Sequence, residues 1–245
     1  LVSPVVAGLA AFCAVKLIFF VVRKMSGGQV ESGFRHGQTV TACLVALSHG
    51  TNDAQKTMGI ITLTLIAVGF QPSGTGPELW VVAICGLAIA LGTYMGGWRV
   101  IRTLGKGLTE ISTPQGFAAE AASATTILVS SHMGFALSTT QVCSGSIIGT
   151  GLGKKGSKVN WGVASKMLIA WIVTFPAAGI VGALACALAK TSVWGTVAVA
   201  FIACAVAFII WRLSRRNPIN SANVNERADV KVNANPNAKT VAAAA

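Results

Sequence analysis

Two of the seven acidic residues lie inside long apolar segments, and these two are the strongest candidates for chemistry. They are Asp53 and Glu120. A carboxylate within a bilayer is costly, so such a group ordinarily faces a cavity and has a partner. Lys56 follows Asp53 by three positions on one helix face and could be that partner. We expect Asp53 to be functional; the alternative is that its ion pair only holds helices together. For Glu120 a functional role and a position at the membrane interface are equally consistent with the sequence.

Asp53 belongs to a polar stretch with hydroxyl, amide and carboxylate groups beside a glycine: Ser48-His49-Gly50-Thr51-Asn52-Asp53-Ala54-Gln55-Lys56-Thr57-Met58-Gly59. We expect the helix to break near Gly50 and restart near Asn52, which would turn free N–H groups and a positive dipole end toward an anion. Carbonyl groups of the preceding half and the Asp53 carboxylate could hold a cation. The alternative is a kinked helix whose hydroxyls bond back to carbonyls, which suits Thr62 and Thr64 better than this stretch.

A second polar interruption lies in the apolar segment 117–152, which contains Ser130-Ser131-His132 and Ser138-Thr139-Thr140-Gln141. Each arm around this polar middle is shorter than the roughly 18 residues needed for a full crossing. We therefore expect a re-entrant helical hairpin with its tip at 138–141, while charge alternation alone also allows two complete spans. Secondary transporters build their binding sites from interrupted helices of this kind.

The composition indicates that both interruptions belong to a membrane protein. Of 245 residues, 53% are hydrophobic and 11% are charged, with a mean hydropathy of +0.68; soluble proteins contain about 25% charged residues. The net charge of +12 comes from basic residues at the ends of apolar segments, as the positive-inside rule predicts. Aromatic residues do not alternate with them as in chains that stack nucleic-acid bases, and the six cysteines form no Cys-x-x-Cys pair. We predict an all-α integral membrane protein without a nucleic-acid partner.

Five apolar segments supply the expected membrane helices: 1–22, 38–70, 80–98, 117–152 and 161–211, the last divided near Lys190 into spans 161–189 and 193–211. If every basic cluster is cytoplasmic, 38–70 crosses once and 117–152 leaves and re-enters on one side. This predicts a polytopic helical bundle with one discontinuous helix and a re-entrant hairpin, forming a transporter repeat over 38–211. The Asn- and Ala-rich tail, 212–245, is expected to be disordered and cytoplasmic. Because the sequence begins within an apolar run without Met, we expect 1–22 to be a truncated helix.

Three segments, in this order, resemble the inorganic phosphate transporter family. The stretch His49-Gly50-Thr51-Asn52-Asp53-Ala54-Gln55-Lys56 resembles its Gly-x-Asn-Asp signature, in the second-half copy of bacterial low-affinity permeases. Gly116-Phe117-Ala118-Ala119-Glu120 resembles the acidic segment at the start of its hairpin. Ser138-Thr139-Thr140-Gln141 resembles its Pro-x-Ser-Thr-Thr-His hairpin tip, with Leu137 where proline is common and Gln141 where histidine is common. The family has two inverted repeats and the signature occurs once here, so the resemblance implies a missing N-terminal repeat.

The resemblance implies secondary active transport of inorganic phosphate across the cytoplasmic membrane, by symport with a proton or a sodium ion. It implies a substrate and ion site lined by Thr51, Asn52, Asp53, Gln55, Lys56, Thr57, Ser138, Thr139, Thr140 and Gln141. Glu120 is the candidate for handling the coupling ion. No organic cofactor or bound metal is expected, although a divalent metal could be carried with phosphate. The expected partners are phosphate, the coupling cation, the lipid bilayer, the missing repeat and, as a further candidate, a second copy of the chain in a homodimer.

Three other interpretations remain open. Sulfate or another oxyanion is the alternative substrate, because its size and charge are close to those of phosphate. A metal-dependent intramembrane enzyme would use His49 and Asp53, but the sequence has no His-Glu-x-x-His motif. A structural membrane subunit is the third interpretation. The glycine and lysine run 149–155 lacks the spacing of a P-loop. The four-residue spacing of Gly92 and Gly96, and of Gly145 and Gly149, favours close helix packing.

Overall fold

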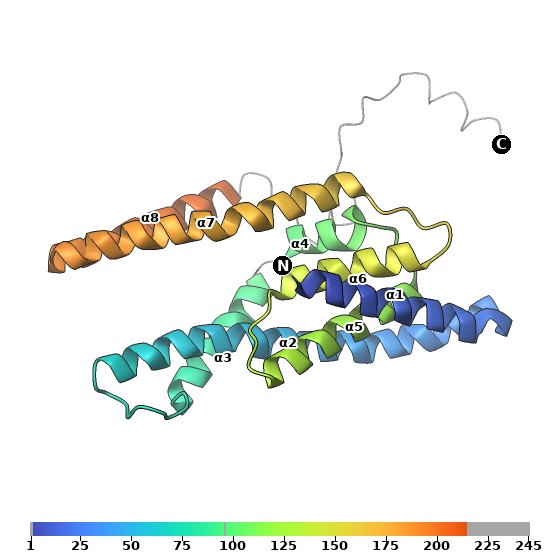
Figure 1. Ribbon diagram of the computed structural model, residues 1–245, viewed down its shortest axis with the longest axis horizontal. Helices are drawn as coiled ribbons and strands as arrows, with labels where there is room; N and C mark the ends of the chain where they lie inside the picture. The colour runs from blue at the N-terminus through green and yellow to red at the C-terminus, as the bar shows by residue number, and fades with distance from the viewer. Residues whose placement is uncertain (1, 96, 215–245) are drawn as a thin grey trace, which may run out of the picture.

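The computed structural model describes residues 2–95 and 97–214, which form helices and connecting segments (Figure 1). In chain order the helices are α1 (Ser3–Val21), a 3-10 turn (Val22–Lys24), α2 (Gly27–Ala67), α3 (Leu79–Met95), α4 (Trp98–Arg102), a π-helical turn (Thr103–Gly107), α5 (Thr113–His132), α6 (Thr139–Gly153), α7 (Trp161–Thr191) and α8 (Val193–Ser214). Within the described ranges the β-structure is a single antiparallel bridge between Thr109 and Val159. The all-α fold class is therefore confirmed. Residues 215–245, most of the expected disordered tail, lie outside the described residues.

In the part of the chain that the structure describes, three helices are long and apolar enough to cross a membrane: Ser3–Lys24, Trp161–Thr191 and Val193–Leu213. The apolar helix Leu79–Tyr94 is shorter. Large hydrophobic side chains cover the outside of these helices; Phe175 on α7 is 87% exposed and Trp194 on α8 is 80% exposed. Contiguous apolar surface of this extent is not stable in water and indicates contact with lipid or another helix. The chain is a multi-pass membrane protein.

The expected break in the helix around Gly50 is wrong, because α2 continues without interruption through 41 residues. Gly50 keeps a helical backbone and does not adopt a positive φ. Glycine permits a break but does not impose one, and the polar side chains of this stretch satisfy themselves without opening the main chain. Ser48 shows this, since its Oγ donates to the carbonyl of Leu44, 2.5 Å away. At 1.5 Å per residue α2 is about 60 Å long, so it extends beyond the roughly 30 Å hydrocarbon core or tilts strongly.

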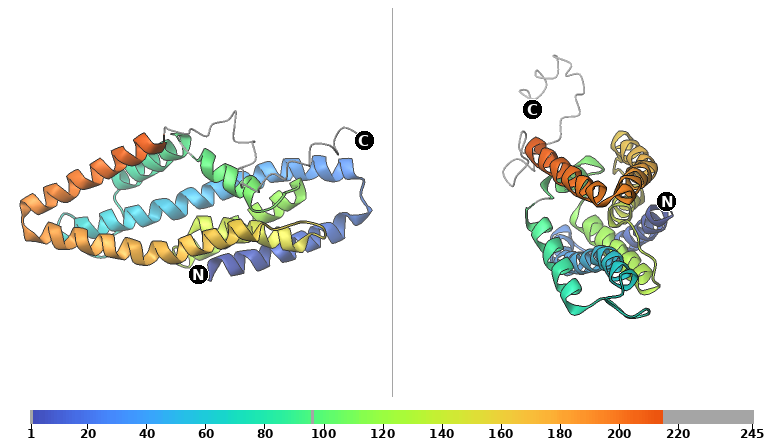
Figure 2. Two further views of the ribbon diagram at one scale, coloured as in Figure 1. Left: turned by 90° about the horizontal axis from the view of Figure 1, so that it is seen from above. Right: turned by 90° about the vertical axis from the view of Figure 1, so that its left-hand side faces the viewer.

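α5 and α6 form a helical hairpin that packs between α1 on one side and α2 on the other (Figures 1 and 2). The connecting turn spans 133–138, and Gly134 adopts a φ of 79° there. α5 begins at a capping box in which Ser112 and Gln115 exchange hydrogen bonds. The hairpin expected over 117–152 is therefore present as two helices, while residues 139–141 belong to the first turn of α6 and not to the tip.

α6 packs closely against α1 along glycines that are spaced four residues apart. A Cβ atom added at Gly145 would overlap the carbonyl oxygen of Pro4, and one added at Gly149 would overlap the carbonyl oxygen of Gly8. Both obstacles are backbone atoms, which cannot rotate away. The expected close packing through small residues is confirmed at Gly145 and Gly149. It is not found at Gly92, where an added Cβ meets no atom within 4 Å, and Gly96 lies outside the described residues.

We expect Gly149→Val to separate α1 from α6 and to lower the thermal unfolding temperature of the purified protein in detergent. Overpacking of a tight interface typically costs about 1–3 kcal/mol. The matched control is Gly179→Val on α7, where an added Cβ meets no atom within 4 Å. Equal unfolding temperatures for the two variants would contradict the close α1–α6 contact.

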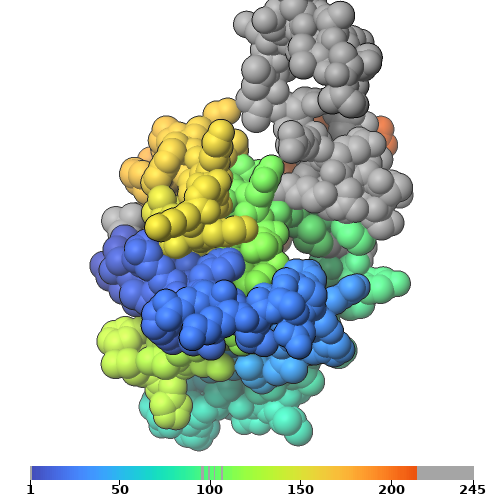
Figure 3. Space-filling view, turned by 90° about the vertical axis from the view of Figure 1, so that its right-hand side faces the viewer, coloured from blue at the N-terminus to red at the C-terminus, as the bar shows by residue number. Residues whose placement is uncertain are grey.

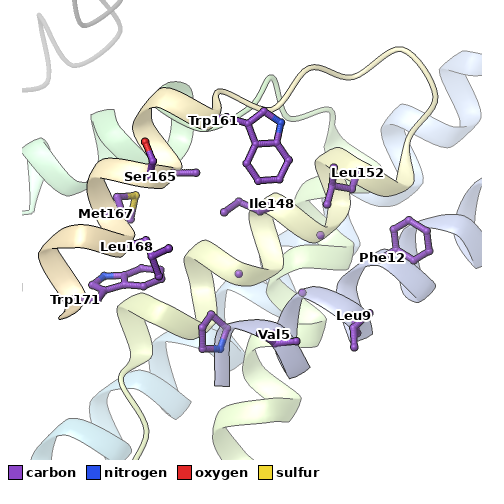
Figure 4. A pocket seen from close by; sticks show the side chains of 15 residues that line it. Val5, Leu9, Phe12, Ile148, Leu152, Trp161, Ser165, Met167, Leu168 and Trp171 are labelled. Atoms are coloured by element: carbon purple, nitrogen blue, oxygen red, sulfur yellow. The ribbon is translucent and has the colours of Figure 1, made fainter. Parts of the chain in front are cut away.

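α7 and α8 pack on each other as a second hairpin along one side of the molecule (Figures 1 and 2). Between α7 and the α1–α6 pair lies an apolar groove of about 580 Å³. Its walls include Phe12 of α1, Leu152 of α6, and Trp161 and Trp171 of α7. Figure 4 shows the aromatic rings of Phe12 and Trp161 beside this groove. Figure 3, viewed from the right-hand side of Figure 1, shows the segment that leads into α7 (yellow) beside the green segment that precedes α5.

Candidate functional site

The polar face of α2 meets the turn between α5 and α6, and Asn52 is the residue at the centre of that contact. Its side chain is 1% exposed. Its Nδ2 donates to the Leu137 carbonyl over 2.9 Å, while its Oδ1 accepts from the Leu137 N–H over 3.4 Å and from the Ser131 hydroxyl over 3.3 Å. Asn52 thus satisfies both main-chain groups of one turn residue. This fixes the hairpin turn against the middle of α2.

The Leu137 side chain holds the same turn from its other side. It packs against a buried cluster formed by Ala7, Ile127 and Val142, one residue from each of α1, α5 and α6. The motif Pro-x-Ser-Thr-Thr-His has its proline two residues before the serine, which is the position of Ala136 in this chain, so the expectation that Leu137 stands in place of that proline is wrong.

Asp53 lies next to Asn52, beside the first turn of α6, and gathers four polar partners. Its Oδ1 is 2.9 Å from the Lys56 ammonium and 3.2 Å from Asn52 Nδ2. Its Oδ2 is 3.0 Å from His49 Nε2 and accepts from the Thr139 hydroxyl over 3.5 Å. The Asp53 side chain is 34% exposed and that of Lys56 39%, so the pair borders open space and remains accessible to small ions.

The first turn of α6 contributes hydrogen-bond donors to this place. The helix starts at Thr139, and the Val142 N–H closes its first main-chain bond on the Ser138 carbonyl over 3.0 Å. The N–H groups of residues 139–141 therefore have no partner within the helix, and the positive end of its dipole lies beside Asp53. The donors expected from a restarted α2 come instead from α6. Thr139 is also in contact with His49, whose Nε2 is 3.2 Å from the Thr139 hydroxyl.

The structure brings part of the expected set together and leaves part of it apart. Asn52, Asp53, Lys56 and Thr139 form the cluster just described. Ser138 and Thr140 are exposed and Gln141 is half-buried, all within or next to the first turn of α6. Thr51, Gln55 and Thr57 are exposed and make no side-chain hydrogen bond to another described residue. Thr51 and Gln55 lie on the side of α2 opposite Asp53, whereas Thr57 follows Asp53 by four residues on the same face. Their role in a site stays a prediction.

Glu120 belongs to a separate polar cluster further along α2. Its carboxylate accepts from the Thr41 hydroxyl over 2.6 Å, and the Gln38 side chain lies near it. Within the described chain no Lys, Arg or His nitrogen lies within 4.0 Å of it, so its described partners are neutral. Thr41 and Asp53 are twelve residues apart on one helix, which places the two clusters about 18 Å apart. Glu120 therefore does not contact the Asp53 cluster.

Sequence reasoning missed three contributors to these clusters: Ser131, the main chain of Leu137, and Thr41. Each contacts a residue about 80 positions away, and no local spacing indicates such a pairing. His49 was considered only as a metal ligand, although its position four residues before Asp53 on one helix face is the signal for their contact. Among the described residues no three His, Cys, Asp or Glu side chains converge in a way that could hold a metal ion.

A family model, curated relatives and a solved structure that match this chain are all of phosphate transporters. Residues 1–182 match the model of the phosphate transporter family. A probable low-affinity inorganic phosphate transporter of Mycobacterium tuberculosis (strain ATCC 25618 / H37Rv) is 48% identical over 227 residues, which cover 91% of this chain and 54% of that protein. One of Mycobacterium leprae (strain TN) is 52% identical over 185 residues, covering 75% of this chain and 45% of that protein. The chain spans about half the length of the curated relatives it matches.

A solved structure titled "The sodium-dependent phosphate transporter" superposes with a TM-score of 0.55. The match covers 71% of this chain and 52% of that one, with 25% sequence identity. The resemblance in fold extends over most of the described helices.

Proposed function

The chain belongs to the phosphate transporter family, and from that premise we propose that it forms one half of a secondary transporter that carries inorganic phosphate across the cytoplasmic membrane by symport with a cation. The family and its relatives are transporters and not enzymes, which disfavours the metal-dependent intramembrane enzyme. The observation that carries the proposal is the convergence of Asp53, Lys56 and the first turn of α6 at one accessible place.

Phosphate would bind at the start of α6. The unpaired N–H groups of residues 139–141 and the hydroxyls of Ser138, Thr139 and Thr140 can all donate to phosphate oxygens. Lys56 adds a positive charge, while its donation to the Leu137 carbonyl over 2.7 Å holds its ammonium close to the turn. Thus one small region offers main-chain donors, hydroxyls and a cation to a single oxyanion.

A cation would bind at Asp53, and the balance of charges explains why the two ions would travel together. Asp53 is paired with Lys56, and His49 is a further partner of its carboxylate. A phosphate that draws Lys56 away leaves Asp53 without its counter-charge, and a bound cation restores it. Each ion therefore strengthens the binding of the other, which is the reciprocal coupling that symport requires.

The remaining expected residues suit contact with the rest of the protein. Thr51 and Gln55 are exposed on the side of α2 opposite Asp53, and Thr57 is exposed one turn after Asp53 on the same face. Because the chain spans about half of its relatives' length, a second inverted repeat would cover these sides and complete the site near the middle of the membrane. We place the C-terminus on the cytoplasmic side, from the positive-inside rule, and include a homodimer as a further assembly.

The coupling ion is proposed to be sodium, with a proton as the alternative. Support for sodium comes from the solved relative, whose title calls it sodium-dependent. Glu120 is a second candidate for the coupling ion, since a carboxylate with Thr41 and Gln38 as neutral oxygen-bearing neighbours suits a hard cation. No organic cofactor is proposed, and phosphate could be carried as a complex with a divalent metal.

The experiment is labelled-phosphate uptake by the full-length protein in sealed vesicles, under imposed sodium or proton gradients. We expect uptake that an inward sodium gradient accelerates and that unlabelled phosphate inhibits more strongly than sulfate. In Glu120→Gln, the concentration of cation for half-maximal uptake should rise if Glu120 takes part in coupling. Vesicles that take up sulfate but not phosphate would favour the oxyanion alternative, and vesicles that take up neither would end the proposal.

A further inference from the structure

A polar cavity of about 880 Å³ lies at the opposite end of α6 from the Asp53 cluster. It forms where the segment 105–111 meets the segment 154–160, at the end of the molecule viewed in Figure 3. Its described lining contains three lysines, Lys154, Lys155 and Lys158, and one carboxylate, that of Glu110. Three positive charges and one negative charge give the described lining a formal charge of +2.

The two segments that form this loop cavity are fastened to each other. Thr109 and Val159 form an antiparallel β-bridge, and the Asn160 N–H donates to the Leu108 carbonyl over 2.8 Å. The Thr109 hydroxyl, on a residue that is 4% exposed, donates to the Lys158 carbonyl over 3.1 Å. The cavity is therefore shaped by tertiary contacts and is not a gap between loose loops.

The positive charges of the loop cavity have no counter-ion in the described chain. No carboxylate of a described residue lies within 4.0 Å of any of its three lysine ammonium groups. Among the described residues Lys154 donates only to neutral groups: the Ser112 hydroxyl over 3.3 Å and the side-chain oxygen Oε1 of Gln115 over 3.2 Å. Since Gln115 is fully buried and holds Lys154 in place, the ammonium is fixed near the cavity before any ligand arrives.

We infer that the loop cavity binds a phosphate group from the cytoplasmic side, at a site separate from the transport site. Lysine ammonium groups bind phosphate as point charges, and unneutralised lysines in a shaped polar cavity favour such an anion over a neutral ligand. The positive-inside rule places this lysine-rich segment on the cytoplasmic face. The two sources of the group there are the headgroup of an anionic phospholipid and inorganic phosphate. The length of α6, about 22 Å for 15 residues, separates this site from Asp53.

The test uses the full-length transporter in detergent and measures the shift of its unfolding temperature as ligand is added. One arm titrates short-chain phosphatidylglycerol against short-chain phosphatidylcholine, and the other titrates inorganic phosphate against chloride at matched ionic strength. The variant is Lys155→Gln with Lys158→Gln, which spares the hydrogen-bonded Lys154. The matched control is Lys166→Gln with Lys190→Gln, since these two α7 lysines do not line the cavity.

We expect the Lys155/Lys158 variant to bind the anionic ligand about 25-fold more weakly than the wild type, from roughly fivefold for each lysine near an anionic headgroup. The control pair should bind as the wild type does. Weaker binding of phosphatidylglycerol alone identifies a lipid headgroup, and weaker binding of inorganic phosphate alone identifies the free ion; either result supports the site. Unchanged affinity for both ligands, or an equal loss in the control pair, overturns it. Phosphate bound at the transport site contributes equally to all variants and does not affect the comparison.

Discussion

Asp53→Asn is expected to abolish coupled phosphate uptake by the full-length transporter while leaving its fold intact. The substitution keeps the size of the side chain but removes the negative charge that lies 2.9 Å from Lys56 and 3.0 Å from His49. Without that charge the cluster cannot hold a cation, so phosphate loses its coupling partner. We expect the initial uptake rate to fall on the order of 100-fold, because the substitution removes one member of a partly desolvated cluster of charges. Initial rates of labelled-phosphate uptake into vesicles measure the effect.

The matched control for this variant is Glu78→Gln, which makes the same change from acid to amide on an exposed residue ahead of α3. It should transport as the wild type does. Unfolding temperature and elution volume on a sizing column separate lost transport from lost folding, and both should be unchanged in Asp53→Asn. Normal uptake by Asp53→Asn would favour the structural-subunit interpretation, in which the ion pair with Lys56 only holds α2 in shape.

Local spacing in the sequence predicted the contacts within one helix. Lys56 follows Asp53 by three residues, which places both side chains on one face of any helix, and their contact is confirmed. The spacing of Gly145 and Gly149 predicted close packing for the same reason, because residues four positions apart lie on one face of a helix. Hydrophobicity and charge placement likewise predicted the helical membrane fold. These properties depend on neighbours in sequence and need no knowledge of the tertiary structure.

Local spacing can indicate that a helix face packs closely, but it could not predict which residues of another helix that face contacts. The sequence places polar groups at 48–57 and at 138–141, but nothing in it shows that Asn52 accepts from the Leu137 N–H or that Thr41 reaches Glu120. The same limit explains the wrong break in α2. A glycine within a polar stretch suggests an opened main chain, whereas the hairpin turn supplies partners for those side chains and leaves the helix intact. The free N–H groups then come from α6.

Asn52→Ala is expected to release the hairpin turn from α2 and to impair both stability and transport. The substitution removes the partner of the Leu137 N–H and carbonyl together, in a place that is almost completely buried. A buried main-chain group left without a partner costs about 1–3 kcal/mol, and Lys56 still donates to that carbonyl, so we expect a loss of about 2 kcal/mol in the free energy of unfolding. Thermal and denaturant unfolding in detergent measure it.

Transport by Asn52→Ala should fall further than the loss of stability explains, because the turn positions the start of α6 beside Asp53. A shift of even 1 Å there separates the Thr139 hydroxyl, already 3.5 Å away, from the carboxylate. At a temperature where the variant is fully folded, the phosphate concentration for half-maximal uptake should therefore still rise. Gln29→Ala is the matched control, since it removes an exposed amide from the same helix. If Asn52→Ala unfolds at a lower temperature yet binds phosphate with unchanged affinity, Asn52 supports the fold alone and the first turn of α6 does not take part in binding phosphate.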